Sequence, residues 1–237
     1  MMLLDPVRAP LLVAAMSIAM FHTFVGVDHY LPFVVLGRAR GWSTRKVLGI
    51  TALCGLGHVI GSILLGCVGL LIGMGLGQMS WIEGVRGELA AWLLIGFGLA
   101  YMAWSWVRVQ RNARHAHVHV HEDGVAHHHE HDHHREHAHV HTAGATTFWG
   151  LFVIFVLGPC EPLIPLLMVP AVEHDWWLVA EVSALFAGFT IVTMVTMAWL
   201  GTLGLRLVPA KAVETWGNVA AGGAIAASGL AIQLLGI

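Results

Sequence analysis

The sequence predicts an all-α integral membrane protein with six transmembrane helices, arranged as an inverted 3+3 repeat with broken helices 1 and 4. Hydrophobic residues make up 57% of the chain and charged residues 11%, a composition far from that of a soluble domain. The apolar stretches run about 20 residues or more, which is enough to cross a ~30 Å hydrocarbon core. Both halves interrupt their first apolar stretch at a cluster of polar residues, and this match predicts the repeat.

The apolar stretches define six predicted spans, which divide the chain into two repeats and a loop. The first is interpreted as a mature span because no basic segment precedes it, and signal-peptide cleavage would fall beside His22. The chain then divides into a first three-helix repeat (1–107), a His-rich loop (108–146) and a second three-helix repeat (147–237). The spans lie near 11–35, 47–75, 88–107, 147–171, 177–203 and 212–236.

The repeat is predicted from an alignment of the two halves. Laying Gly26 on Gly158 puts Asp28 over Cys160 and His29 over Glu161. Three spans in each half force the halves into opposite orientations, which is the plan of many secondary transporters. Substrate sites in such proteins lie where helices of the two halves are broken.

Lysine and arginine positions predict the orientation. Ten of the twelve lie in the loops after spans 1, 3 and 5, and only Arg8 and Arg86 lie on the other side. Loops rich in these residues stay in the cytoplasm. We therefore expect a multi-pass protein of the cell (inner) membrane, with both termini outside and the His-rich loop in the cytoplasm.

The two helix breaks carry the residues that suggest chemistry. The first is His22-Thr-Phe-Val-Gly26-Val-Asp28-His29, in which a distorted turn at Gly26 could bring Asp28 and His29 to one ion. The second is Gly158-Pro-Cys160-Glu161-Pro, where the prolines prevent a regular helix. An ionised side chain at mid-membrane costs ~2.5–3.5 kcal/mol, so such residues indicate function. Histidine, cysteine and carboxylate are ligands of divalent transition metals.

These considerations predict one mid-membrane metal site. His58 on the second span adds a further imidazole, and Cys54 stands one turn before it on the same face. Nitrogen and sulfur donors argue against Mg²⁺ or Ca²⁺, which prefer oxygen. The predicted ligands are Asp28, His29, His22, His58, Cys160 and Glu161, with Cys54 and Thr193 as a second tier.

The loop between the halves predicts a second kind of metal binding. Residues 115–141 hold thirteen of the seventeen histidines, interleaved with acidic residues. No apolar periodicity survives, so we expect the segment to be disordered without metal. Most imidazoles are unprotonated near neutral pH, which favours metal capture or buffering over a solvated linker without a role. The histidines are His115, His117, His119, His121, His127, His128, His129, His131, His133, His134, His137, His139 and His141.

Several of these motifs resemble known families. His22-x-x-x-Gly26-x-Asp28-His29-x-Leu31 resembles the signature of the hydrogenase/urease accessory nickel permeases. The similar motif of the nickel/cobalt permeases has four residues between the histidine and the Asp-His pair, whereas this chain has five. His58 resembles the second-helix histidine of the nickel/cobalt transporter families. The His-rich loop is similar to that of nickel/cobalt efflux proteins. These families all belong to the lysine-exporter-like superfamily, whose members are built from inverted three-helix repeats.

The resemblance implies a secondary transporter of divalent transition-metal ions, with Ni²⁺ or Co²⁺ preferred and Zn²⁺ as a further candidate. The metal would be the substrate. The sequence has no nucleotide-binding motif, so we expect neither an enzyme nor a nucleotide cofactor. Protons are the expected coupling ion because histidine and carboxylate ligands lose protons when they bind metal. The first motif resembles uptake proteins and the loop resembles efflux proteins; we favour efflux.

The same residues leave alternatives and partners open. Gly158-Pro-Cys160-Glu161-Pro also looks like helix 4 of sulfite exporters and of thiol-redox carriers for cytochrome c biogenesis. Asp28 and Glu161 would repel an anion, however, and the position opposite Cys160 is Asp28 where a redox carrier needs a second cysteine. Expected partners are the lipid bilayer and metal ions, with a second copy of the chain and a cytoplasmic metallochaperone as candidates. A net charge of −2 argues against nucleic acid.

Overall fold

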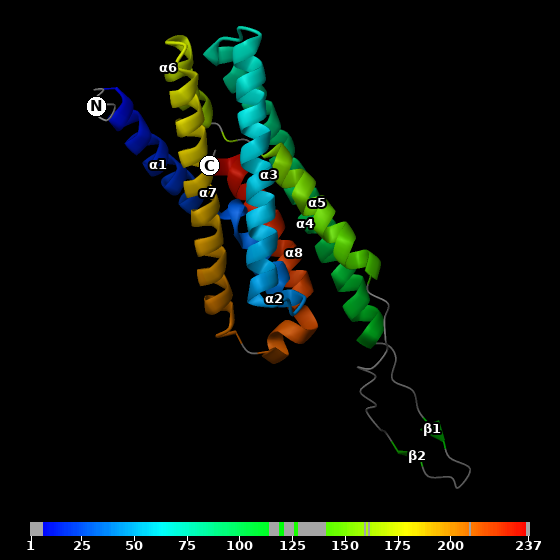
Figure 1. Ribbon diagram of the computed structural model, residues 1–237. Coiled ribbons are helices and arrows are strands. Elements are labelled where there is room, and N and C mark those ends of the chain that lie inside the picture. Colours follow the sequence, from blue (N-terminus) through cyan, green and yellow to red (C-terminus); the bar gives the residue numbers. More distant parts are fainter. Residues whose placement is uncertain are drawn as a thin grey trace.

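The computed structural model describes residues 7–113, 119–120, 126–127, 141–158, 160, 162–208 and 210–235. These residues form eight α-helices, so the predicted all-α class is confirmed (Figure 1). The elements are α1 (Arg8–Val25), the 3-10 helix η2 (Val27–His29), α2 (Leu31–Ala39), α3 (Thr44–Leu71), α4 (Leu76–Ala113), β1 (His119–Val120), β2 (Ala126–His127), α5 (His141–Leu157), α6 (Leu163–Val172), α7 (Trp176–Leu205) and α8 (Ala210–Leu235).

The helices are those of a multi-pass membrane protein. Within the described part of the chain, five helices are long and apolar enough to cross a membrane: α1, α3, α4, α7 and α8. The fourth predicted span, 147–171, corresponds to two shorter apolar helices, α5 and α6. The six-span topology and its inverted repeat therefore remain predictions, whereas five apolar spans are observed.

The break predicted in the first span is present at Gly26. α1 ends at Val25, and the Gly26 N–H donates to the His22 carbonyl oxygen at 2.9 Å. One turn of 3-10 helix follows, and α2 then begins at Leu31 with a proline in its first turn, where a missing N–H costs nothing. The chain thus changes direction in the short segment that holds Asp28 and His29.

The second predicted break separates α5 from α6. α5 ends at Leu157, and α6 begins at Leu163 with Pro162 as its N-cap residue. The Leu163 N–H donates to the Cys160 carbonyl oxygen at 2.9 Å, which closes the turn into α6. Pro159 and Glu161 lie outside the described residues.

The third span begins earlier than predicted, and this corrects the position of Arg86. Span 88–107 was expected, but α4 covers Leu76–Ala113. A tight turn joins it to α3, with Gly73 at φ 72°, a left-handed conformation that suits glycine. Arg86 therefore lies inside α4, beside Glu83, and not in an outer loop. Pairing of the two charges allows the helix to continue through a segment that reads as polar.

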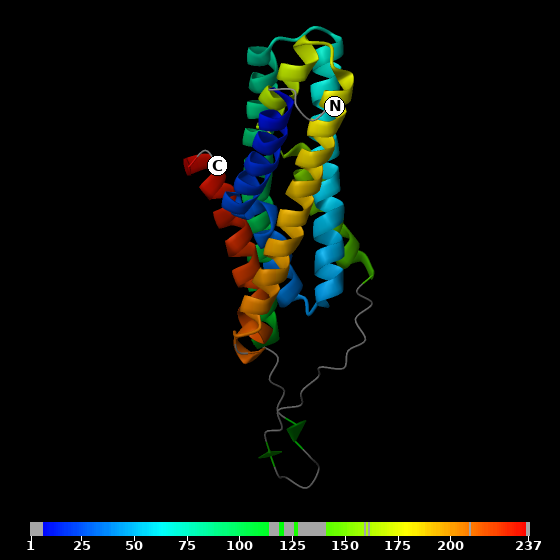
Figure 2. The same ribbon diagram turned by 60° about the vertical axis from the view of Figure 1, so that its left-hand side comes forward.

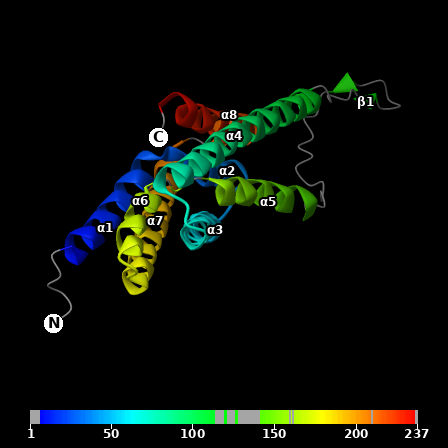
Figure 3. The ribbon, with the colours of Figure 1, turned by 90° about the horizontal axis from the view of Figure 1, so that it is seen from above.

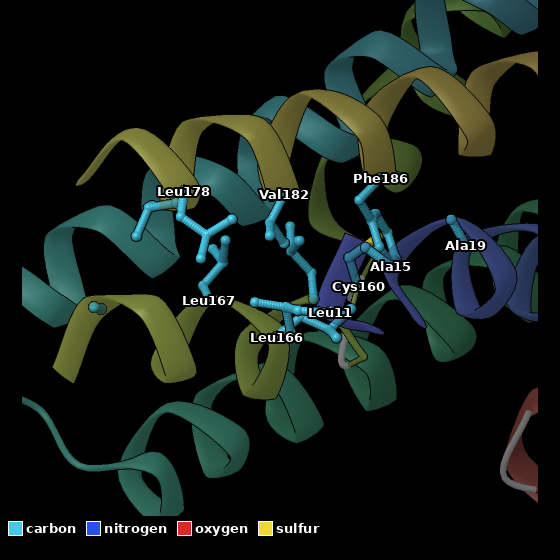
Figure 4. Close-up of a cluster of buried hydrophobic side chains, with 12 residues drawn as sticks. Leu11, Ala15, Ala19, Cys160, Leu166, Leu167, Leu178, Val182 and Phe186 are labelled. Carbon is cyan, nitrogen blue, oxygen red and sulfur yellow. The ribbon is translucent and has the colours of Figure 1, made fainter. Parts of the chain in front are cut away.

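The bundle is built from closely packed helices, of which α4 and α8 make the most extensive pair. α4 and α8 lie side by side and approach so closely that a Cβ at Gly98 would fall 2.4 Å from the Ala226 nitrogen (Figure 1). Such contacts between small residues replace the hydrophobic driving force that lipid does not supply. α3 packs against α5 and α7, which Figure 3 shows from the end of the bundle. α1 packs against α7 through Leu11, Ala15 and Phe186 (Figure 4).

Basic residues gather at one end of this bundle. The turns α2–α3 and α7–α8 lie there together with the C-terminal end of α4 (Figures 1 and 2). Arg38 Nη2 donates to the Val208 carbonyl oxygen and Arg206 Nη2 donates to Thr44 Oγ1, both at 2.9 Å. Those of the loop basic residues that the structure describes thus lie at one end of the bundle. The assignment of that end to the cytoplasm stays a prediction.

Candidate metal centre

Three metal-binding side chains meet where the two breaks approach α3. They are His22 of α1, His58 of α3 and Cys160 in the α5–α6 break, and their ligand atoms all lie within 4.8 Å of one another. The Cys160 sulfur is 3.2 Å from His58 Nε2. His58 and Cys160 are buried, with 3% and 0% of their surface exposed. Two imidazoles and a thiol at this spacing are a donor set for Ni²⁺, Co²⁺ or Zn²⁺.

His58 is oriented for coordination by a backbone group. Its Nδ1 lies 3.1 Å from the Phe155 carbonyl oxygen. Because a carbonyl only accepts, Nδ1 carries the proton and the Nε2 lone pair faces the Cys160 sulfur. Metal-binding histidines are typically held in this way, with the second ring nitrogen donating to a carbonyl or carboxylate. The arrangement fixes both the tautomer and the direction of the ring.

Unsatisfied ring nitrogens mark the centre as a place for a ligand. In the described part of the chain, Nε2 of His22 and Nε2 of His29 are buried without a hydrogen-bond partner. A buried polar atom without a partner costs about 1–3 kcal/mol. The rings of His22, His29 and His58 form a series, with centroids 5.0 Å and 5.2 Å apart and edges turned toward faces. An ion bound among them would satisfy nitrogens that the protein leaves open.

Asp28 and His29 form a pair beside the three donors. His29 Nδ1 lies 3.0 Å from the Gly26 carbonyl oxygen and 3.2 Å from Asp28 Oδ1. The one-turn helix η2 brings these atoms together, since a regular helix would splay adjacent side chains by ~100°. The predicted ligand set is thus divided into a His22–His58–Cys160 triad and an adjacent Asp28–His29 pair.

A cavity of about 540 Å³ leads to the centre. Its lining includes His22, Asp28, His29 and His58 and, from α4 and α8, Glu88 and Gln233. Irregular backbone at membrane depth is tolerated where it borders such a space. The imidazoles of His22, His29 and His58 thus border a cavity.

The remaining predicted residues lie elsewhere. Cys54 is buried in a hydrophobic cluster with Phe33 and Met194, and the described metal-binding group does not include it. Thr193 is half-buried on α7 and is absent from the described lining of the cavity. Glu161 lies outside the described residues. The loop histidines do too, apart from the backbones of His119 and His127 in the strand pair and of His141, where α5 begins.

Two residues that sequence reasoning did not identify border the centre. Glu83 of α4 is fully buried, and its Oε2 accepts a hydrogen bond from the Cys160 N–H at 2.9 Å. Arg86, one turn later, pairs with Glu83. Two opposite charges three residues apart inside an apolar stretch were the available signal, because isolated charges are costly there and paired ones are not.

We predict that Gly26→Ala weakens metal binding. An added Cβ would lie 2.5 Å from His29 Nδ1, too close for an atom of the ring to remain where it is. The ring must rotate away from Asp28, and we expect a loss in Co²⁺ affinity of about tenfold, as when a supporting partner of a ligand is removed. Titration of purified protein with Co²⁺ measures this.

Gly96→Ala is the matched control for this prediction. A Cβ there meets nothing within 4 Å. It should leave Co²⁺ affinity unchanged and slightly favour the helix. Equal affinities of the two variants would show that the space at Gly26 does not matter to the centre.

Comparison with known proteins returned no relative. No protein-family model, curated protein or solved structure matches the chain. The described residues form five helices that are long and apolar enough to span a membrane and a largely buried His22–His58–Cys160 group whose spacing could hold a metal ion.

Proposed function

We propose that this protein is a secondary transporter of divalent transition-metal ions and that His22, His58 and Cys160 bind the transported ion. The observation that carries the proposal is the meeting of donors from three separate segments at the two helix breaks. Breaks beside a mid-membrane site are characteristic of secondary transporters. A purely structural metal site needs no cavity, whereas this one borders a space of about 540 Å³.

The Asp28–His29 pair suits proton coupling. It lies next to the triad, with the His29 ring in edge contact with both His22 and His58. A metal ion in the triad repels a proton on His29, and its departure allows the proton to return. Exchange of metal for proton at adjacent groups needs no nucleotide. Nickel and cobalt are the favoured substrates on the resemblance of the His22–His29 motif, and efflux is the favoured direction.

Metal content of expressing cells tests the proposal. Ni, Co, Zn and Cu are measured together in cells that carry the wild-type chain, Asp28→Asn or an empty vector. Efflux predicts lower Ni and Co with the wild type than with the vector, and a return to vector levels with Asp28→Asn. The same metal content in all three would contradict transport. If transport requires a thiol and oxidants block it even in the absence of metal, the thiol-redox alternative is favoured instead.

We predict that deletion of 115–141 raises the metal concentration needed for half-maximal transport and leaves the saturated rate mostly unchanged. A polyhistidine segment raises the local metal concentration near the entrance without joining the membrane pathway. The difference from wild type should vanish below pH ~6, where imidazoles protonate and release metal. Flux into vesicles across a range of Ni²⁺ and pH measures both effects. Complete loss of flux, with normal membrane insertion, would place the loop in the pathway.

A further inference from the structure

The break between α5 and α6 leaves backbone groups that neither helix can satisfy. The last carbonyls of a helix lack intrahelical donors. The Gly158 N–H donates back to the Phe155 carbonyl oxygen, but the carbonyls of Val156 and Gly158 and the N–H of Cys160 need donors and acceptors from other helices. At membrane depth water is scarce, so each group must find a partner in the protein. The chain meets this need with two side chains of α4.

Arg86 satisfies the carbonyls on the α5 side. Its Nη2 donates to the Val156 carbonyl oxygen at 3.0 Å and to the Gly158 carbonyl oxygen at 3.3 Å. Its Nη1 pairs with Glu83 and lies 3.5 Å from Ser62 Oγ, one turn beyond His58 on α3. The planar fork of arginine thus connects α3, α4 and the end of α5, which lysine cannot do with one ammonium.

Glu83 satisfies the N–H on the α6 side. Its Oε2 accepts from the Cys160 N–H at 2.9 Å, while the Cys160 carbonyl oxygen accepts from Leu163. The Cys160 backbone is therefore held on both sides, with its sulfur 3.2 Å from His58 Nε2. Glu83 and Arg86 compensate each other's charge, which makes their burial tolerable.

We infer that the Glu83–Arg86 pair is a positioning device that holds the Cys160 thiol against His58, so that the metal site is assembled before an ion arrives. The inference rests on the proposed function, which supplies the identity of the bound ion as a divalent transition metal. It concerns hydrogen-bond geometry rather than charge, because the two residues together are neutral. Neither residue belongs to the His22–His58–Cys160 group. Glu83 acts through the backbone of Cys160, and Arg86 acts through the carbonyls of the residues that precede it.

Two neutral double variants separate geometry from charge. Glu83→Ala with Arg86→Ala removes the hydrogen bonds that the pair makes to the break, whereas Glu83→Gln with Arg86→Gln keeps an amide oxygen at position 83 that can still accept from the Cys160 N–H. Both are made in a Cys54→Ala, Cys67→Ala background and titrated with Co²⁺, whose thiolate charge-transfer band reports Cys160 alone. We expect the alanine pair to weaken Co²⁺ binding about 10–100-fold and lose the band, and the glutamine pair to recover it.

The matched control removes the other arginine–glutamate ion pair described in the structure. Arg8→Ala with Glu181→Ala removes the ion pair between the first residue of α1 and α7 and keeps the apolar packing of the two helices, so it should leave the band and affinity unchanged. Arg86→Lys preserves charge and folding but not the fork, and we expect it to weaken Co²⁺ binding severalfold. If the alanine pair does not fold, Arg86→Lys decides: unchanged affinity and band overturn the inference.

A readout without metal separates this inference from the proposed function. Loosening of the break should speed alkylation of Cys160 by about tenfold in the alanine pair, because local opening exposes a buried thiol. Equal alkylation rates in folded wild type and alanine pair overturn the positioning role, whatever the metal result. If wild type gives no band that depends on Cys160, the proposed function fails, and alkylation still decides whether the pair holds the break.

Discussion

Replacing His58 by alanine is expected to abolish transition-metal transport while the helices still form. His58 is the central donor, 3.2 Å from the Cys160 sulfur and in ring contact with His29. Its loss removes a ligand outright, so Co²⁺ affinity should fall by more than the roughly 10–100-fold that supporting residues account for. Metal titration of purified protein and flux in vesicles measure the two effects.

His174→Ala is the control for this prediction. His174 is exposed in the turn before α7, and its Nδ1 lies 3.1 Å from the nearby Val172 carbonyl oxygen. That variant should transport as the wild type does. Retention of more than half of the wild-type flux by His58→Ala would exclude the triad as the transport site.

Replacing Glu83 alone by alanine is expected to destabilise the fold more than any other single change considered. It leaves the Arg86 charge in the membrane interior without its carboxylate partner and removes the acceptor of the Cys160 N–H. Breaking a buried pair by removing one member typically costs about 3–5 kcal/mol. Thermal unfolding in detergent should show a clear drop in midpoint relative to wild type.

Two comparisons sharpen this second prediction. Glu88→Ala removes an exposed carboxylate little more than one turn further along α4, and it should change stability by less than about 0.5 kcal/mol. The Glu83→Ala, Arg86→Ala pair should be more stable than Glu83→Ala alone, because it leaves no unpaired charge. A single variant as stable as wild type would mean that Arg86 does not depend on this partner.

The breaks could be predicted from the sequence because their causes are local. Prolines at 159 and 162 exclude a regular helix, and polar residues after Gly26 are costly in lipid unless the chain turns to give them a site. The same argument identified His22, His58 and Cys160, which the structure brings together. Residue chemistry and helix period were sufficient for these features.

The side chains that support the centre could not be predicted, because their contacts join residues of different helices that lie far apart in the sequence. Glu83 reaches the Cys160 N–H 77 positions away, a contact that no periodicity encodes. Hydropathy treats Glu83 and Arg86 as two polar residues, so it placed the start of the third span too late along the chain. The division between the triad and the Asp28–His29 pair likewise follows from the 3-10 turn of η2, whose geometry the sequence only permits.

The origin of the three donors has a consequence for biosynthesis. His22 and His58 enter the membrane with α1 and α3, but Cys160 follows only after α4, the His-rich segment and α5 have been made. A nascent chain shorter than this lacks the third donor of the centre, so the His22–His58–Cys160 site is incomplete even though Cys54 and Cys67 are already present. Because segments generally dock as the chain emerges, the centre acquires its full donor set only after α1 to α5 have been made. Incomplete chains released by the ribosome would therefore not sequester metal at this centre.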